Sequence, residues 1–385
     1  MTADGTAEPA SPGLRVDQLR GFRIGVTSDR RSGDLIAALE RRGAQVLHAP
    51  ALTIAPNDQD SVLVEETRAL IAARPDTVLV TTGYGMRRWF EVADAAGLGA
   101  ELTAVLDQAR VLARGPKALG AVRAAGLEDA EMSAIETTAS LVDRVVASAE
   151  PGGRVGIQLH GYTDEEQLAR LRAVSERVLT VTPYRWVAPA STDRLPRLIE
   201  AACSGLLDAV TFTSAPGADA TLAAARALGL LEEFVAVLRR DVVAVAVGPV
   251  TAGPLREAGI EPVLPDRYRM GALIRLVCEH LERHRVLRLR AGEVDLELRG
   301  RGLTIGKDRI LLGPNALALF RRLAESPAVV SRAELISCLP DHPDDHVLEV
   351  AMSRLRRTLG MPDLITTVVK RGYRLNAVRL PAAGD

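Results

Sequence analysis

The residues best suited to a chemical task lie in a predicted helix near the C-terminus. One face combines two guanidinium groups with small or polar positions at helical spacing, Val350, Ser353, Arg354 and Arg357. The other face is an apolar stripe, Leu348, Met352, Leu355 and Leu359. An arginine on such a helix can bond O6 and N7 of guanine in the major groove of duplex DNA. A solvated, arginine-rich surface helix is the alternative that charge alone leaves open.

A predicted β-hairpin follows this helix, and its tip is basic. A β-branched run that includes Thr367 leads to Lys370 and Arg371, and Tyr373 begins the returning strand. We expect Lys370 or Arg371 to contact phosphates or to enter the minor groove. The helix and the hairpin together predict a surface for double-stranded DNA.

A second set of polar residues occurs in two copies earlier in the chain. The motif Arg23-Ile-Gly-Val returns as Arg154-Val-Gly-Ile, and Ala113-Arg-Gly-Pro116 returns as Ala246-Val-Gly-Pro249. Five such landmarks keep offsets of 131 to 133 residues. We infer that residues from about 20 to 283 contain two copies of one α/β unit.

The repeated motifs fall where predicted strands end and helices begin, at the carboxyl edge of a parallel sheet. Hydroxyl groups, glycine N–H groups and helix N-termini at such an edge bind anions. The sequence therefore predicts a cleft between two lobes for a ligand with several carboxylates or phosphates. The repeated positions are Thr82, Gly115, Thr213, Ser214 and Gly248. For any one of them, a helix N-cap or a turn is the alternative.

Alternating elements must position these residues. Predicted strands at 23–27, 45–48, 77–81 and 110–113 alternate with predicted helices at 34–42, 60–73 and 86–96. This order predicts an α/β body of parallel sheets flanked by helices. Further strands are expected at 286–289, 294–298 and 310–312. A short connector near 280–290 would join the body to the C-terminal domain.

Composition restricts the classes of function. The 385 residues predict two or three domains, and 17 Lys and Arg against 12 Asp and Glu from His284 onward make the tail basic on an acidic body. Three cysteines without metal or redox spacing favour a reducing cytoplasm. No metal motif, common catalytic motif or membrane-spanning run is found, and residues 1–19 resemble a disordered tail.

The C-terminal motifs resemble the winged helix-turn-helix effector domain of the OmpR/PhoB class of transcription regulators. The resemblance rests on Ser353-Arg-Leu-Arg-Arg357 and Thr367-Val-Val-Lys-Arg-Gly-Tyr-Arg-Leu375. It implies a DNA-binding domain at 284–380, which binds DNA as a homodimer in many members of that class. His346 and Glu349 stand where the class has Arg and Asp.

Residues 20–283 resemble uroporphyrinogen-III synthase. The motifs are Thr81-Thr-Gly83, Thr182-Pro-Tyr-Arg-Trp186, Phe212-Thr-Ser214 and Val247-Gly-Pro-Val-Thr-Ala252. The resemblance implies two α/β lobes, one from about 20–50 and 190–283 and the other from about 55–180. It also implies further substrate-binding positions, namely Thr27, Ser28, Arg30, Gly83, Arg114, His160, Gly161 and Thr251.

That family cyclises the linear tetrapyrrole hydroxymethylbilane without a cofactor, with loss of water and inversion of the last ring. Its substrate carries eight carboxylates, in agreement with the predicted anion-binding cleft. The resemblance implies that Tyr184 is the tyrosine that helps the hydroxyl group leave, as a general acid.

Two hypotheses follow for the whole chain. In the first, it is a working synthase that also binds DNA. In the second, the body has lost catalysis and senses a tetrapyrrole or another polycarboxylate for a transcription regulator. Tyr184 favours the first hypothesis. The displaced Arg30 and the altered turn at Leu159-His-Gly-Tyr162 favour the second. Nothing in the body resembles a phosphoacceptor domain, so we expect control by ligand.

Overall fold

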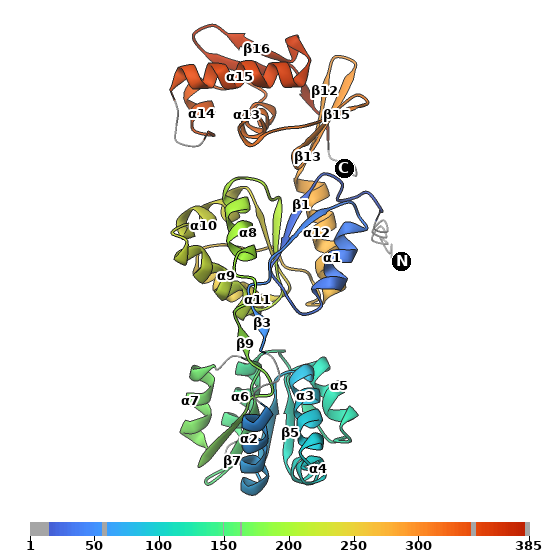
Figure 1. The fold of residues 1–385 in the computed structure, drawn as a ribbon, viewed down its shortest axis with the longest axis vertical. Coiled ribbons are helices and arrows are strands. Elements are labelled where there is room, and N and C mark those ends of the chain that lie inside the picture. The colour runs from blue at the N-terminus through green and yellow to red at the C-terminus, as the bar shows by residue number, and fades with distance from the viewer. Residues whose placement is uncertain (1–14, 56–59, 149, 162–163, 340–343, 382–385) are drawn as a thin grey trace, which may run out of the picture. The chain divides into compact units, whose positions relative to one another are not determined.

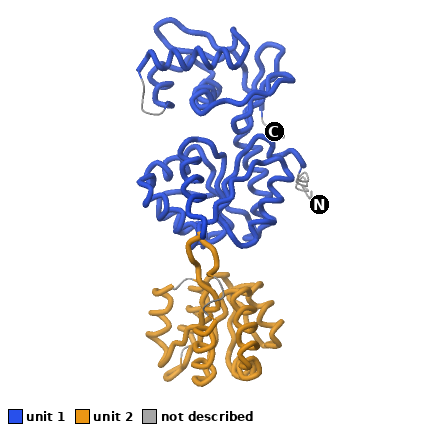
Figure 2. The backbone as a smooth tube through the Cα atoms, viewed as in Figure 1, with its two compact units in different colours: residues 1–51, 190–385 blue, residues 52–189 orange. Residues whose placement is uncertain are grey.

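The computed structural model describes residues 15–55, 60–148, 150–161, 164–339 and 344–381. The predicted α/β class with parallel sheets flanked by helices is confirmed (Figure 1). The chain divides into two compact units (Figure 2). Unit 1 contains residues 1–51 and 190–385, and unit 2 contains residues 52–189.

Unit 2 is built on a parallel sheet of strand order β6-β5-β4-β7-β8. Its strands are β4 (Thr77–Val80), β5 (Arg110–Ala113), β6 (Glu131–Met132), β7 (Arg154–Gln158) and β8 (Arg177–Val181). Its helices are α2 (Asp60–Ala73), α3 (Gly83–Ala95), α4 (Gly99–Gln108), α5 (Pro116–Ala124), α6 (Thr138–Ala147) and α7 (Glu165–Val174). The short strands β3 (Thr53–Ile54) and β9 (Trp186–Val187) pair antiparallel.

Alternating apolar residues bury both faces of this sheet. Val78 and Val80 point into a core formed with α2 to α5, whereas Leu79 packs into a second core with α6 and α7. The continuous apolar run of β4 is therefore explained by burial on both sides. A close approach of α3 to α5 also requires Gly83, because a Cβ there would lie 2.2 Å from the backbone oxygen of Lys117.

Unit 1 contains a second parallel sheet of strand order β11-β10-β1-β2. Its strands are β1 (Arg23–Val26), β2 (Gln45–His48), β10 (Ala209–Phe212) and β11 (Val243–Ala246). Its helices are α1 (Ser32–Glu40), α8 (Arg194–Cys203), α9 (Ala215–Ala227), α10 (Leu231–Arg240), α11 (Pro249–Glu257) and α12 (Met270–His284). One face packs on α8 to α11 and the other on α1 and α12.

The C-terminal part of unit 1 has a different construction. An antiparallel sheet of order β15-β14-β13-β12-β18 contains β12 (Val286–Ala291), β13 (Val294–Arg299), β14 (Gly302–Ile305), β15 (Asp308–Leu311) and β18 (Val378–Arg379). The remaining elements are α13 (Pro314–Glu325), α14 (Arg332–Ile336), α15 (Asp345–Leu359), η2 (Pro362–Leu364), β16 (Ile365–Val368) and β17 (Gly372–Leu375). The order of helices followed by the β16–β17 hairpin is that of a winged helix.

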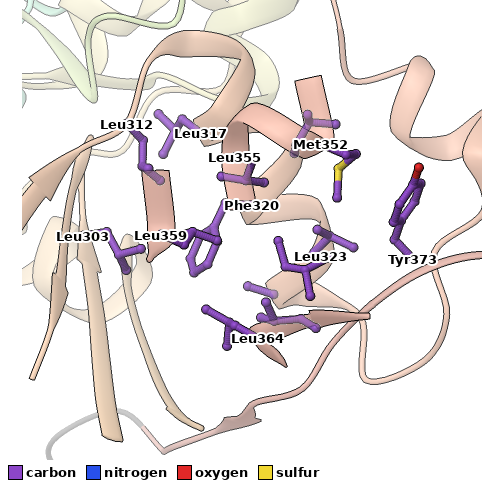
Figure 3. Packing of buried hydrophobic residues seen from close by; sticks show 14 of the residues in the cluster. Leu303, Leu312, Leu317, Phe320, Leu323, Met352, Leu355, Leu359, Leu364 and Tyr373 are labelled. Atoms are coloured by element: carbon purple, nitrogen blue, oxygen red, sulfur yellow. The ribbon is translucent and has the colours of Figure 1, made fainter. Parts of the chain in front are cut away.

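One apolar cluster holds the winged-helix elements together. The predicted stripe of α15, Leu348, Met352, Leu355 and Leu359, is buried in it. Figure 3 shows labelled members of this cluster, among them Phe320 of α13, Leu355 of α15 and Leu364 of η2, which extend from three different elements into one core. Burial of this stripe fixes which face of α15 remains outside.

Three sequence expectations differ from the structure. At the end of the predicted tail, Gln18 and Leu19 are buried, and Leu19 belongs to one apolar cluster with Phe22 and Leu281, whereas residues 15–17 are exposed and residues 1–14 lie outside the described residues. The predicted connector is reduced to Arg285 between α12 and β12. Strand β14 was not predicted, and β15 begins two residues before the predicted strand, because glycine turns at Gly300 and Gly306 shorten the alternating pattern.

No helix in the described part of the chain is long and apolar enough to cross a membrane.

Candidate functional site

Four strands of unit 2 bring candidate residues to one edge of its sheet. Thr82, Arg114, His160 and Tyr184 each follow the carboxyl end of β4, β5, β7 or β8. These strands are parallel neighbours, because β4 pairs with β5 and β7, and β7 pairs with β8. The sequence predicted such a gathering for the repeated motifs, and in unit 2 the sheet places them on one edge.

Tyr184 lies at the centre of an aromatic group at this edge. Its ring centroid is 5.1 Å from that of Tyr84 and 5.8 Å from that of Trp186, in both cases in an edge-on arrangement. Only 7% of Tyr184 is exposed. Gly161 lies against these rings at φ +76°, and a Cβ there would come within 2.8 Å of Tyr184 and of Trp186. Gly161 therefore serves to admit the two rings.

Arg114 is the cation of this edge. It lies largely buried after β5, and its Nη1 donates to Oγ1 of Thr138 at 3.4 Å. Burial lowers the pKa of Arg114, while the nearby Tyr184 and Glu136 oppose that shift. A guanidinium next to a phenol stabilises the phenolate relative to the phenol, so it strengthens a tyrosine as a proton donor.

His160 lies beside Arg114 in the same group. Burial, followed by the positive charge of Arg114, lowers the pKa of His160 from 6.5 to about 4. The imidazole is therefore neutral at pH 7. It can accept or donate a hydrogen bond to a ligand, but it cannot supply the positive charge that a carboxylate arm would favour.

The depressed pKa predicts acid sensitivity of unit 2. Between pH 6.5 and about pH 4 the unfolded state binds a proton at His160 and the folded state does not. The free energy of unfolding is therefore highest above the unfolded pKa of about 6.5 and decreases as the pH falls toward 4. At about 1.4 kcal/mol per pKa unit, the loss amounts to at most about 3–4 kcal/mol. His160→Asn should remove this part of the pH dependence.

Tryptophan fluorescence isolates the effect. Both tryptophans of the chain, Trp89 and Trp186, lie in unit 2, and His160 is the one histidine in the sequence of that unit. Urea unfolding followed by fluorescence at pH 7 and pH 5 compares wild type with His160→Asn. His346→Asn, an exposed position on α15, is the matched control. Equal pH dependence in all three proteins would contradict the assignment.

Two pairs of repeated positions have the same local geometry in both units. Thr82 is the N-cap of α3 and accepts from Gly85 N at 3.1 Å, and Ser214 is the N-cap of α9 and accepts from Gly217 N at 3.2 Å. Gly115 and Gly248 each precede a helix-starting proline in extended conformation. Thr82 and Ser214 therefore act as helix N-caps, and Gly115 and Gly248 lie in turns, as the alternative interpretation of the sequence expects. The N–H groups of the first turns of α5 and α11 remain at the sheet edge.

The candidates of unit 1 differ in accessibility. Thr27 is buried and donates to Thr211 O at 2.9 Å, and Thr251 is buried within α11. Both residues are thus part of the interior of unit 1, and this burial speaks against a direct contact of their side chains with substrate. Arg30 and Thr213 are partly exposed, and the Oγ of Ser28 is buried without a hydrogen-bond partner among the described residues.

Sequence reasoning missed several residues around these positions. Buried Gln158, at the end of β7, accepts from Thr82 N at 3.1 Å and so holds the start of α3. The ring of the exposed Tyr268 lies against Gly248, where a Cβ would come within 3.0 Å of it. Gln158 had a detectable signal, a polar residue ending the apolar run Arg154-Val-Gly-Ile; Tyr268 had none.

A pocket in unit 2 opens beside Tyr184. Tyr84 and Tyr184 line it together with Arg88, Arg185 and Thr182, and its other lining residues are Ile54, Ala55, Asp60, Leu63 and Pro183. Arg88 is paired with Asp60 at 2.5 Å, so its charge is neutralised locally. Among the described residues no group of three His, Cys, Asp or Glu is placed to hold a metal ion.

The outward face of α15 forms a second candidate surface. Val350, Ser353, Arg354 and Arg357 are all exposed, as predicted from the helical spacing. Arg356, the remaining arginine of the motif, is hydrogen-bonded within the domain. Arg356 donates to Ile365 O at 3.0 Å and to Thr367 Oγ1 at 2.8 Å, so it ties α15 to the β16–β17 hairpin.

Two predicted DNA-binding residues of the hairpin, Tyr373 and Thr367, lie in different surroundings. Tyr373 is only 3% exposed, because β17 bonds Val330 and because Arg332 and Arg356 lie over its ring. Thr367 is exposed, but its hydroxyl oxygen accepts from Arg356. Lys370, at φ +60°, and Arg371 are exposed at the tip, where the sequence placed them.

Acidic residues near α15 are paired within the domain. Arg332 lies 2.9 Å from Glu349 and 3.7 Å from Asp345, measured between nitrogen and oxygen atoms. The pairing reduces the negative charge that these two side chains would present to phosphates. His346, beside them, is exposed at the start of the helix.

The fold and these surfaces define a two-part protein, a synthase-like α/β body with a winged helix-turn-helix domain. The family model described as Uroporphyrinogen-III synthase HemD matches residues 33–275, which is more than half of the chain. The chain belongs to this family. The model described as Transcriptional regulatory protein, C terminal, matches residues 306–375, so the chain also carries a domain of that OmpR/PhoB type. Both resemblances found in the sequence are confirmed.

Individual relatives agree with this assignment. An uncharacterized protein of Bacillus subtilis, YjjA, is 28% identical over 271 residues, which is 69% of this chain and 97% of that protein. A provisionally named uroporphyrinogen-III synthase of Methanothermobacter thermautotrophicus is 28% identical over 63% of this chain and 92% of its own length. The structure of a mutant uroporphyrinogen III synthase from the bacterium Thermus thermophilus has a TM-score of 0.58 and 29% identity, covering 68% of this chain and 99% of that chain.

Proposed function

We propose that the body of this protein binds hydroxymethylbilane and closes it to uroporphyrinogen III. The observation that carries the proposal is the placement of Tyr184, in an aromatic group beside Arg114 and among the residues that line a pocket. In the proposed step, the Tyr184 phenol protonates the leaving hydroxyl and water departs. The cationic methylene left on the first ring bonds to the last ring at the carbon that already carries the bridging methylene, and the older bond from that carbon to the bridging methylene breaks. The last ring turns over, its free α-carbon bonds to the released bridging methylene, and the proton lost from that carbon returns to the Tyr184 phenolate.

The carboxylate arms of the substrate need partners that do not move during the reaction. In unit 2 we assign them to Arg114 and to the backbone N–H groups after Thr82 and Gly115. Unit 1 carries further candidate positions for an anion, namely Arg30, Ser28 and the corresponding helix starts at Ser214 and Gly248. Thr213 lies partly exposed beside Ser214 and completes this set.

The test of this proposal is the consumption of substrate. Freshly generated hydroxymethylbilane is followed with and without the purified full chain. Consumption that is faster than spontaneous closure, and proportional to the protein concentration, supports the proposal. A rate equal to the spontaneous rate at every protein concentration would overturn it.

We also propose that the winged-helix domain binds duplex DNA through the exposed face of α15 and the hairpin tip. The supporting observation is that the apolar stripe of α15 is buried and its cationic face is outside. Binding through Arg354, Arg357, Lys370 and Arg371 should weaken steeply as salt is raised. A binding constant that does not depend on salt would contradict this assignment.

A second candidate function is a ligand sensor without catalysis. One observation favours it, namely that the position after β7 holds His160, whose lowered pKa leaves it neutral beside Arg114. Such a protein would bind a tetrapyrrole polycarboxylate and alter DNA binding, but it would not form product. Tight binding of uroporphyrin III, together with closure at only the spontaneous rate, would support this candidate over the synthase.

A further inference from the structure

Tyr184 is carried by a short turn whose anchoring lies outside the sequence motif. The turn runs from the end of β8 at Val181, through Thr182 and Pro183, to Tyr184. Glu66 of α2 binds it from the side. Its Oε2 accepts from the backbone N–H of Thr182 at 2.7 Å, and its Oε1 accepts from Thr182 Oγ1 at 3.3 Å. One carboxylate therefore receives both hydrogen-bond donors of a single residue.

The bond between Glu66 and the Thr182 N–H fixes the backbone directly before Tyr184. Pro183 has no N–H group and a fixed φ, so Thr182 offers the last backbone donor before Tyr184. Beyond Tyr184, Ala55 N donates to Arg185 O at 2.9 Å, at the start of the β3–β9 pairing. The Tyr184 backbone is thus held on one side by Glu66 and on the other by β3.

We propose that Glu66 is a positioning residue for Tyr184: its carboxylate fixes the Thr182–Pro183 turn, and the turn sets the place of the Tyr184 ring. The inference rests on the proposed synthase function. Burial raises the pKa of Glu66, against the Thr182 bonds and Arg185, which lower it. The Glu66 carboxylate is half-buried although burial disfavours its charged form, and such carboxylates are frequent at functional sites.

The experiment separates geometry from charge. Glu66→Ala removes both acceptors, whereas Glu66→Gln keeps an oxygen for the Thr182 N–H and an amide that can donate to Thr182 Oγ1. We expect Glu66→Ala to lower kcat by about 10- to 100-fold, with KM changed by less than about threefold, because small displacements of a catalytic group slow the reaction strongly. Glu66→Gln should recover most of kcat. Glu65→Gln, an exposed neighbour, is the control.

Two outcomes would overturn the proposal. If Glu66→Ala retains full kcat, the turn does not need this carboxylate. If Glu66→Gln loses as much kcat as Glu66→Ala, the negative charge acts directly and the residue is not a positioning group. Urea unfolding of each variant, followed by tryptophan fluorescence, gives the folded fraction to which the rates are normalised.

A second readout keeps the inference testable if the wild type shows no ring closure, which would refute the proposed function and not the positioning role. The chain has five tyrosines, so incorporation of 3-fluorotyrosine gives few fluorine resonances, and Tyr184→Phe identifies that of Tyr184. Glu66→Ala should shift or broaden this resonance, and Glu66→Gln should restore it. An unmoved Tyr184 resonance in Glu66→Ala would refute the positioning role whatever the activity.

Discussion

Replacing Tyr184 with Phe should slow ring closure by about 100- to 10,000-fold, the range expected for loss of a positioned general acid. The change removes one oxygen atom and keeps the ring between Tyr84 and Trp186. We therefore expect the free energy of unfolding to change by no more than about 1.5 kcal/mol, the typical net value of one hydrogen bond. The measurement is kcat with hydroxymethylbilane, at saturating substrate and over a range of pH.

Tyr84→Phe is the matched variant for this experiment. Tyr84 belongs to α3 and lines the same pocket, but the electrostatic partner of Arg114 is Tyr184. A loss of less than about tenfold in Tyr84→Phe, beside the large loss in Tyr184→Phe, would assign proton donation to Tyr184. Full activity of Tyr184→Phe would exclude the general-acid role.

The second large effect is expected on DNA binding. Arg354→Ala and Arg357→Ala should each weaken binding to a duplex selected from a random pool by about 1–3 kcal/mol, if each arginine reads a base. The two residues have no ion pair within the described part of the chain, so their guanidinium groups are available to DNA. The double variant should bind at least about 30-fold more weakly if the effects add.

The control for these variants lies in the same domain. Arg290 of β12 is exposed and paired with Asp295 at 2.7 Å, and Arg290→Ala should leave the dissociation constant unchanged. Titrations with the selected duplex and with random duplex, at several salt concentrations, separate base reading from phosphate contact. An equal loss on both duplexes would mean phosphate contact, and an unchanged midpoint for the double variant would contradict a DNA-facing α15.

Much of the fold could be predicted from local sequence patterns. The short continuous apolar run of β4 has the length of a strand that is buried on both faces, and the stripe Leu348, Met352, Leu355 and Leu359 has the period of a helix; both are buried as expected. Strand β14 escaped prediction because its residues 302–305 are too few to establish an alternation between two glycine turns. Short strands obtain their stability from their neighbours in the sheet.

The candidate site was harder to predict because its contacts are distant in sequence. Glu66 and Thr182 are 116 residues apart, and no local pattern joins them. Tyr373 was predicted to be a surface residue of a hairpin, yet the pairing of β17 with Val330 turns its ring inward. Hydroxyl residues such as Thr82 and Ser214 could be placed at helix starts, because capping is decided locally.

The proposed synthase function requires that this chain direct the closure of hydroxymethylbilane. The most direct measurement is the isomer composition of the product, separated after oxidation, with the full chain and with Tyr184→Phe in parallel. We expect the type III isomer with wild type and mainly the spontaneous type I isomer with Tyr184→Phe. Only type I product with the wild-type chain would refute the synthase function and leave a regulator built on a synthase fold.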